Sequence, residues 1–202
     1  MSPRKILEFG GYISGALLII FGIAAIYMGV DGRSTVRDSL KQEQIYFGNA
    51  AEDPAVAEHA KQWSEEQVLN GDQARAFALV MREHTLEGSE GLTYAQMGRF
   101  VSAAKPDDPA GTSDEAAALK GEDGQPVPNA ARNTWVTETA LSTALNVSYM
   151  AEQLALFGIV VGVALLLTGI GLLILALAVL GGRFAEKTAG QRVTTEVASF
   201  GH

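Results

Sequence analysis

The sequence predicts an all-α membrane protein, in which an antiparallel two-helix transmembrane hairpin has long helices extending into a small helical extracytoplasmic domain. Three observations support this fold class. Residues 9–30 and 153–182 contain no charged residue, and about 20 apolar residues are enough to cross a bilayer as a helix. Small residues recur along one face of each apolar run. The polar segment between the runs has helix start and stop signals but no strand pattern.

The first apolar run, residues 9–30, is predicted to be transmembrane helix 1, preceded by a cytoplasmic N-terminus at residues 1–8. Arg4 and Lys5 come before it, as basic residues also do in a cleavable signal peptide. The apolar core of a signal peptide is shorter, about 7–15 residues, and no convincing small-x-small cleavage site follows this run. A retained membrane anchor is therefore favoured.

The second apolar run belongs to one long helix, expected from Trp135 to Leu180 because no proline interrupts it. Transmembrane helix 2 is assigned to residues 155–180, and residues 181–202 to a cytoplasmic tail. The part before residue 155 is expected to continue in water. There it would offer the middle domain a packing surface made of Trp135, Leu141, Leu145 and Tyr149.

Each apolar helix has a row of small residues that lie within about 40° of one another on a helical wheel. The first row is Gly11, Gly15, Gly22 and Gly29, and the second is Ala140, Ala144, Ala151, Gly158, Gly162, Gly169 and Ala176. Small residues let helix backbones approach closely in lipid. The rows are therefore predicted to pack on each other, with Gly29 near Gly158 and Gly15 near Ala176. The alternative is that one row faces a different protein.

The distribution of charge predicts the orientation in the cell membrane. Five basic residues flank the chain ends (Arg4, Lys5, Arg183, Lys187 and Arg192), whereas three follow the first apolar run (Arg33, Arg37 and Lys41). This difference favours a multi-pass plasma membrane protein with both termini in the cytoplasm. Residues 31–154 contain 10 Lys and Arg against 20 Asp and Glu, a net charge of −10. Such an acidic segment argues against nucleic-acid binding.

The middle domain, residues 31–154, is predicted to be mostly helical. Asp53-Pro54 is a typical helix start, and a helix is predicted from Pro54 to Val68. Asn70-Gly71 is expected to end that helix. Asp72 would cap a further helix to Leu86, and Thr93 with Gln96 forms a capping-box pattern for a short helix from Tyr94 to Val101. Residues 104–129 are rich in proline, glycine and acidic residues. They are expected to form a mobile acidic loop.

Candidate catalytic residues are few. The chain has no cysteine, and His59 and His84 are the only histidines in the middle domain. A metal site would need both of them together with Glu58, Glu83 or Glu87, yet the two histidines lie on separate predicted helices. No nucleophile elbow or phosphate-binding loop is present in the sequence.

Three stretches carry a family resemblance: MREHTLEGSEGLTYAQM (81–97), GEDGQPVPN (121–129) and WVTETALSTALNVSYMAEQLALFG (135–158). They resemble uncharacterised bacterial two-span membrane proteins with an extracytoplasmic helical domain. Members often carry the label "aromatic ring-opening dioxygenase", which implies an iron site of two histidines and one carboxylate. The spacing of His59, His84 and the nearby glutamates does not support that label.

The sequence therefore favours a non-catalytic integral membrane protein without a cofactor, serving as an accessory or scaffold subunit of a larger membrane assembly. Its expected partners are the lipid bilayer and another membrane protein or a second copy of itself. Two alternatives stay open: a metal-dependent enzyme that uses His59 and His84 with a glutamate, and a homo-oligomeric channel. A channel would have few polar groups to line it, namely Tyr12, Ser14, Tyr27 and Thr168.

Overall fold

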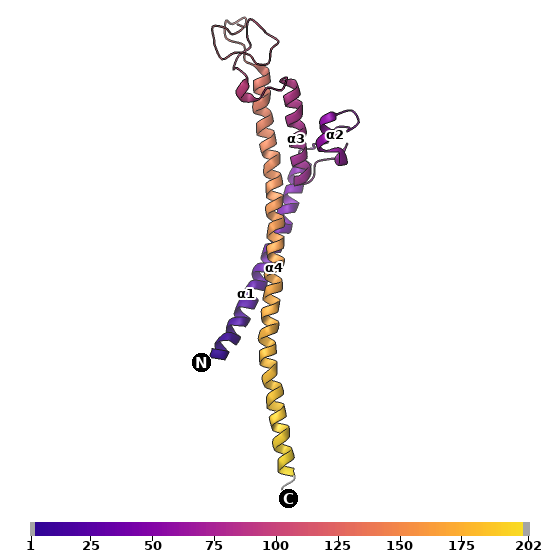
Figure 1. The fold of residues 1–202 in the computed structure, drawn as a ribbon, viewed down its shortest axis with the longest axis vertical. Coiled ribbons are helices and arrows are strands. Elements are labelled where there is room, and N and C mark those ends of the chain that lie inside the picture. The colour runs from indigo at the N-terminus through magenta and orange to yellow at the C-terminus, as the bar shows by residue number, and fades with distance from the viewer. Residues whose placement is uncertain (1–2, 200–202) are drawn as a thin grey trace. The chain divides into compact units, whose positions relative to one another are not determined.

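The computed structural model describes residues 3–199, and in that range the chain is helical with irregular connections (Figure 1). The elements are α1 (Pro3–Gln42), α2 (Pro54–His59), η1 (Lys61–Trp63), α3 (Gly71–Gly88), η2 (Tyr94–Gln96) and α4 (Ala130–Ser199). The chain divides into two compact units. The hairpin unit contains the residues up to Asp31 and those from Leu154 onward, and the middle unit contains Gly32–Gln153.

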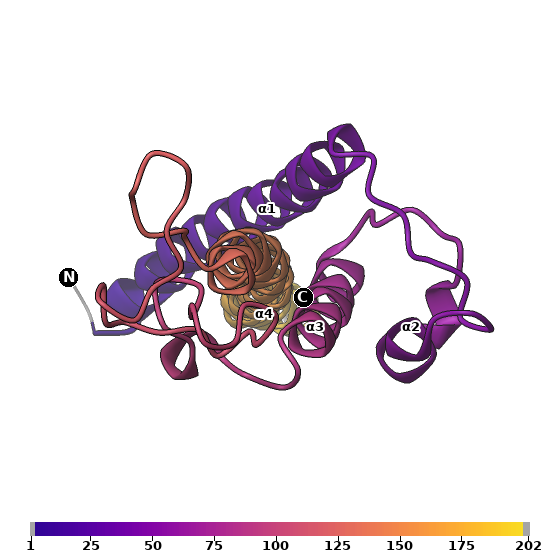
Figure 2. The same ribbon diagram turned by 90° about the horizontal axis from the view of Figure 1, so that it is seen from above.

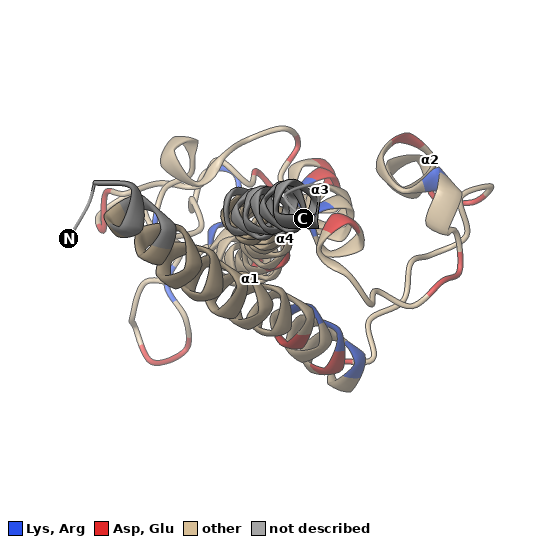
Figure 3. Cartoon of the chain, turned by 90° about the horizontal axis from the view of Figure 1, so that it is seen from below, with Lys and Arg blue, Asp and Glu red and all other residues tan. Residues whose placement is uncertain are grey.

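Two helices are long and apolar enough to cross a membrane, the segments Phe9–Gln42 and Ala130–Ala178. Their large apolar side chains in the hairpin unit point outward. Phe9, Phe21 and Phe157, for example, are each more than 60% exposed. Among the α1 residues that Figure 3 colours, the charged ones lie toward the C-terminal end of the helix. The outer faces of these helices are therefore apolar along the described side chains.

Glycine backbones form the contact between α1 and α4 in the hairpin unit, here called the glycine seam. A Cβ atom added to Gly22 would lie 2.7 Å from the carbonyl oxygen of Gly162, and one added to Gly15 would lie 2.9 Å from that of Gly169. The seam glycines follow one another at intervals of seven residues, which keeps one helix face toward the partner. Residue numbers rise along α1 as they fall along α4, so the helices are antiparallel.

The register of the seam differs from the one expected. Gly15 lies against Gly169 and Leu173, and it is Gly11 that approaches Ala176. Gly29 lies against Ala155 and Ile159, whereas a Cβ on Gly158 would lie 3.8 Å from the Ala25 oxygen. Glycine opposite glycine permits the closest backbone approach. The observed register places Gly22 opposite Gly162 and Gly15 opposite Gly169.

The N-terminal part of the predicted small-residue row on α4 lies in the middle unit, where Ala140, Ala144 and Ala151 are exposed. They are not part of a seam. In the middle unit, α4 instead contacts other helices through larger side chains on different faces. Trp135 and Leu145 are buried as expected, but Leu141 is half exposed.

The core of the middle unit lies where α3 packs against α2, α1 and α4. Its buried members include Leu40, Phe47, Val56, Val68, Val80 and Leu145. Phe47 stacks on Trp63 with ring centroids 6.0 Å apart and meets Phe77 edge-on at 5.5 Å. Figure 2 shows α3 beside α4, with α2 on the far side of α3.

Two predicted helix boundaries in the middle unit are wrong. The helix that begins at Pro54 ends at His59, because the following chain turns and pairs with residues 45–48 through the backbone bonds Phe47 N–H to Glu66 O (3.0 Å) and Val68 N–H to Ile45 O (2.9 Å). Asn70 begins α3 rather than ending the helix before it, since its side chain accepts a hydrogen bond from the Gln73 backbone N–H. The capping pair of Thr93 and Gln96 is present, but its helix is one 3₁₀ turn.

The acidic segment 104–129, expected to be a mobile loop, is cross-linked by backbone hydrogen bonds to residues 98–103. Phe100 pairs with Thr112, while Val101 accepts from Leu119 and donates to Val127. The amide of Asn129, buried at the end of this segment, donates to the Gly98 and Pro109 carbonyls (3.1 and 2.8 Å). Its side-chain oxygen accepts from the first turn of α4. The backbone thus finds partners without forming a strand in the described residues.

The glycine seam predicts a specific disulfide. Because the native chain has no cysteine, the double variant Gly11→Cys/Ala176→Cys contains only the engineered pair. A Cβ on Gly11 would lie 3.5 Å from the Ala176 Cβ, within the range that a disulfide bridges. We expect spontaneous intramolecular cross-linking in membranes, measured by gel mobility. Gly10→Cys/Ala176→Cys is the control, since Gly10 faces open space.

In the same cross-linking background, Gly22→Ala should slow disulfide formation, because the added methyl group would strike backbone atoms of Gly162 and Leu166. The cost of such overpacking is about 1–3 kcal/mol. Gly171→Ala has no atom within 4 Å of the added carbon and should leave the rate unchanged. Equal rates for both alanine variants would contradict the seam.

Candidate functional site

The centre of the middle unit's polar site is the carboxylate of Glu152 on α4. Its Oε1 accepts a hydrogen bond from the Arg33 Nε of α1 at 3.1 Å and forms an ion pair with Arg33 Nη2 at 3.0 Å. Its Oε2 accepts from the Gly71 backbone N–H at the start of α3. Glu152 is 8% exposed. One buried carboxylate therefore joins three helices, and each of its oxygens has a donor.

The start of α3 is built to receive this carboxylate. Asn70 caps the helix, which leaves the Gly71 N–H free to donate to Glu152. The exposed N–H groups and the dipole of a helix N-terminus favour a negative charge. Gly71 must lack a side chain, because a Cβ there would lie 2.8 Å from the Tyr149 Cα and 3.0 Å from the Glu152 Oε2. The protein's own carboxylate thus occupies a site that suits an anion.

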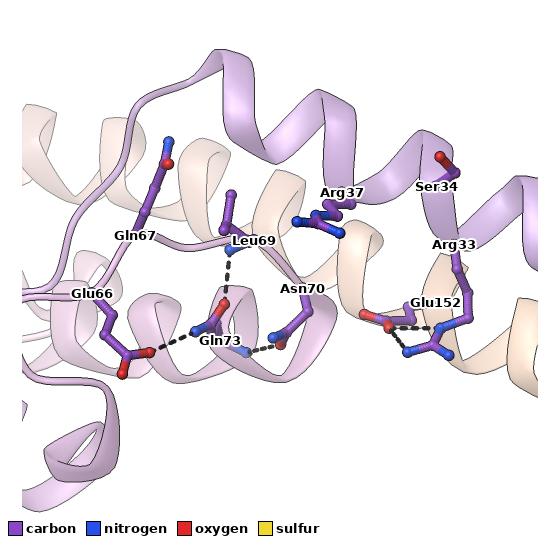
Figure 4. Close-up of a pocket in the computed structure, with 9 residues that line it drawn as sticks. All are labelled: Arg33, Ser34, Arg37, Glu66, Gln67, Leu69, Asn70, Gln73 and Glu152. Carbon is purple, nitrogen blue, oxygen red and sulfur yellow. Dashed lines mark hydrogen bonds and ion pairs between the residues drawn. The ribbon is translucent and has the colours of Figure 1, made fainter.

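An open cleft of about 730 Å³ lies beside this carboxylate (Figure 4). Arg37 extends toward the cleft from α1, between Asn70 and Glu152. On the opposite wall, Gln73 Oε1 accepts from the Leu69 N–H at 2.8 Å, and its amide nitrogen lies 3.4 Å from Glu66. The remaining lining residues are Ser34, Gln67 and Leu69. Guanidinium, carboxylate and amide groups in this arrangement can bind a polar molecule.

A second polar contact joins α2 to α3. The Nε2 atom of His84 lies 3.1 Å from both carboxylate oxygens of Asp53. Asp53 also caps α2, accepting from the Ala55 and Val56 N–H groups at 3.0 and 3.2 Å. Desolvation alone would raise the pKa of Asp53. The hydrogen bonds and the nearby His84 outweigh it and hold the pKa of Asp53 below its ordinary value of 3.8.

The histidines considered as metal ligands serve other contacts or stay apart. His84 is engaged by Asp53, while His59 is the last residue of α2. Among the residues whose side chains the structure describes, no group of three histidine, aspartate or glutamate side chains could hold a metal ion. Glu58, Glu83 and Glu87 are therefore not brought into a ligand set with the two histidines.

Glu152, Arg33 and Gly71 are not among the site residues that the sequence predicts. A usable signal was nevertheless present: Glu152 is the last charged residue before the second apolar run, and Arg33 is the first basic residue after the first run. Pairing the charges that border two antiparallel helices would have proposed this contact. Nothing local in the sequence placed the start of α3 beside it.

No family model, curated protein or solved structure matches this chain. The family resemblance of residues 81–97, 121–129 and 135–158 thus stays a prediction. What the polar site can do is inferred from its geometry.

Removing the Glu152 carboxylate should destabilise the middle unit. In Glu152→Ala the Gly71 N–H and the Arg33 guanidinium lose their acceptor. We expect the loss of about 1–3 kcal/mol, the cost of an unsatisfied buried donor, with Arg33 limiting the effect because its side chain is 48% exposed. Thermal unfolding followed by tryptophan fluorescence measures it, since Trp63 and Trp135 both lie in the middle unit.

Glu115→Ala, which removes an exposed carboxylate of the same unit, is the control and should leave the midpoint unchanged. The double variant Arg33→Gln/Glu152→Gln should lose less stability than the sum of the losses in the two single variants. Each single variant leaves one charge without its partner, whereas the double variant leaves none. Strict additivity would show that the two side chains do not interact.

The Asp53 contact predicts a pH dependence. Because the folded pKa is lowered, the carboxylate contributes stability that is present above about pH 3.8 and is lost as the pH falls through the lower folded value. Asp53→Asn keeps a capping side chain but removes this titration. Unfolding midpoints measured from pH 2.5 to 6 should therefore fall less steeply for the variant than for the natural chain. Parallel curves would contradict the assignment.

Proposed function

We propose that this chain is a non-catalytic, two-span membrane protein that serves as an accessory or scaffold subunit of a larger membrane assembly. Its hairpin unit would cross the cell membrane as two antiparallel helices, with both termini in the cytoplasm and the middle unit outside. The observation that carries this proposal is the outward apolar surface of α1 and α4 in the hairpin unit. This apolar surface is exposed although α1 and α4 already pack on each other at the glycine seam.

The exposure of individual side chains supports a role in the bilayer. Along α4, Phe157, Val160, Leu167 and Ile174 are each more than 60% exposed. A soluble protein would leave such a row to aggregate, whereas lipid tails or a partner helix would cover it. Because the seam takes up the facing glycines, a further partner would bind through these larger side chains.

The polar groups support binding rather than chemistry or transport. Residues 9–30 and 153–182 contain no charged side chain, whereas ion and proton pathways normally place ionisable groups within the membrane. In the middle unit, both carboxylate oxygens of Glu152 already accept hydrogen bonds, one from Arg33 and one from Gly71. His84 is likewise engaged by Asp53. These contacts hold helices together, which suits a protein that presents a surface to a partner.

A photoreactive residue at Phe157 tests the proposal in cells that express the protein at native level. A partner that covers this face should give one cross-linked product of defined mass, and the same partner should co-purify in constant proportion after mild solubilisation. The same residue placed at Tyr94, exposed in the middle unit, serves as a position-specific control. A lone monomer with no adduct from Phe157 would contradict an accessory role.

Orientation is checked in the same cells with single cysteines. A membrane-impermeant maleimide should label Ser113→Cys in intact cells, and it should label Thr188→Cys only after permeabilisation. The reverse labelling pattern would overturn the proposed orientation and would leave the proposal of a partner unaffected.

A further inference from the structure

A second cavity of the middle unit is apolar and encloses about 560 Å³. Its floor consists of Leu40 and Leu145, which are 4% and 6% exposed. Phe77 and Met81 of α3 form one wall, and Leu141 of α4 forms another. This surface, here called the apolar groove, is built by three helices. None of its lining residues belongs to the Glu152 site.

The size of the groove favours a slender occupant. A helix of about 10 Å diameter occupies roughly 420 Å³ per turn, so the groove would hold little more than one turn of a partner helix. Small-molecule sites of about 300–1,000 Å³ are typical, and they are mostly apolar with a few polar groups that orient the ligand. Met81 contributes an unbranched, adaptable side chain to such a wall.

The charge of the residues in and around the groove favours a ligand with a cationic head group. Glu43 is the one charged residue among those that line the groove, and Ser39 lies one turn before it on α1. The other lining hydroxyl, that of Ser148, is turned back to the Ala144 carbonyl at 3.3 Å. Residues 31–154 carry a net charge of −10, which concentrates cations and repels anions around this unit.

We propose that the apolar groove binds a single-chain amphiphile with a cationic head, a long-chain alkyl ammonium, whose chain lies on Leu40 and Leu145 and whose ammonium group lies beside Glu43. The alkyl chain of the ligand replaces water over the exposed apolar walls, and the Glu43 carboxylate accepts hydrogen bonds from the ammonium N–H groups. A fatty acid of the same length would place its carboxylate beside Glu43 and bind more weakly. This site does not depend on a protein partner.

The experiment uses the full chain in phosphatidylcholine nanodiscs and three diazirine-bearing probes of equal chain length: dodecylamine, dodecanol and dodecanoic acid. Photolabelled sites are mapped by mass spectrometry. We expect dodecylamine to label residues 77–81 and 141–145, about tenfold more than dodecanoic acid, a ratio that corresponds to roughly 1.4 kcal/mol. Labelling confined to residues 9–30 and 155–178 would overturn the proposal, because it reports only lipid-phase contact.

Two variants and one control separate the contribution of the apolar walls from that of the Glu43 charge. Ala144→Trp fills the groove that Ala144 lines and should abolish labelling by the amine, whereas Ala140→Trp, an exposed alanine one turn away that does not line it, should not. Glu43→Gln should remove the preference for amine over acid while labelling by dodecanol persists. Circular dichroism confirms that each variant is folded. Equal labelling of the natural chain by amine and acid would overturn the cationic class.

Discussion

The approach of two backbones at glycine is the constraint on which the hairpin unit depends. Lipid tails are as apolar as leucine, so helices in a bilayer gain nothing from hiding leucine against leucine. What they gain is close van der Waals contact. For the proposed bilayer setting of this hairpin, the contacts of Gly22 with Gly162 and of Gly15 with Gly169 supply it. The larger side chains are consequently left on the outside, where they give the hairpin its apolar surface.

A glycine performs the corresponding task in the middle unit, but for a polar contact. Because Gly71 has no side chain, α4 lies against the start of α3 closely enough for Glu152 to accept the Gly71 N–H. Arg33 then neutralises the carboxylate from α1. In both units α4 meets another helix at a residue without a side chain. The first contact is stabilised by dispersion and the second by charge-assisted hydrogen bonds.

These contacts bear on what the protein can do. The buried Glu152 has its donors within the fold, and the Asp53–His84 pair fastens α2 to α3. What the middle unit leaves available is a polar cleft, into which Arg37 extends, and an apolar groove with Glu43 at its side. Both are concave surfaces that suit binding. Two chemically different concave surfaces agree with the role proposed for this chain, that of a membrane-anchored subunit.

Sequence alone determined that two apolar helices bracket a helical middle, because charge-free runs and helix periodicity are local properties of the chain. It also singled out the seam glycines by their shared face. Their register was decided by tertiary contact, since a small-residue face permits several alignments and the sequence does not choose among them. Tertiary contact likewise shortened α2, because residues 45–48 offered the backbone partners that helix continuation would have used. The position of Gly71 beside Arg33 and Glu152 was the hardest to predict. The two charges border the apolar runs and are visible in the sequence, but only the packing of three helices brings the start of α3 to them, and no local pattern encodes that contact.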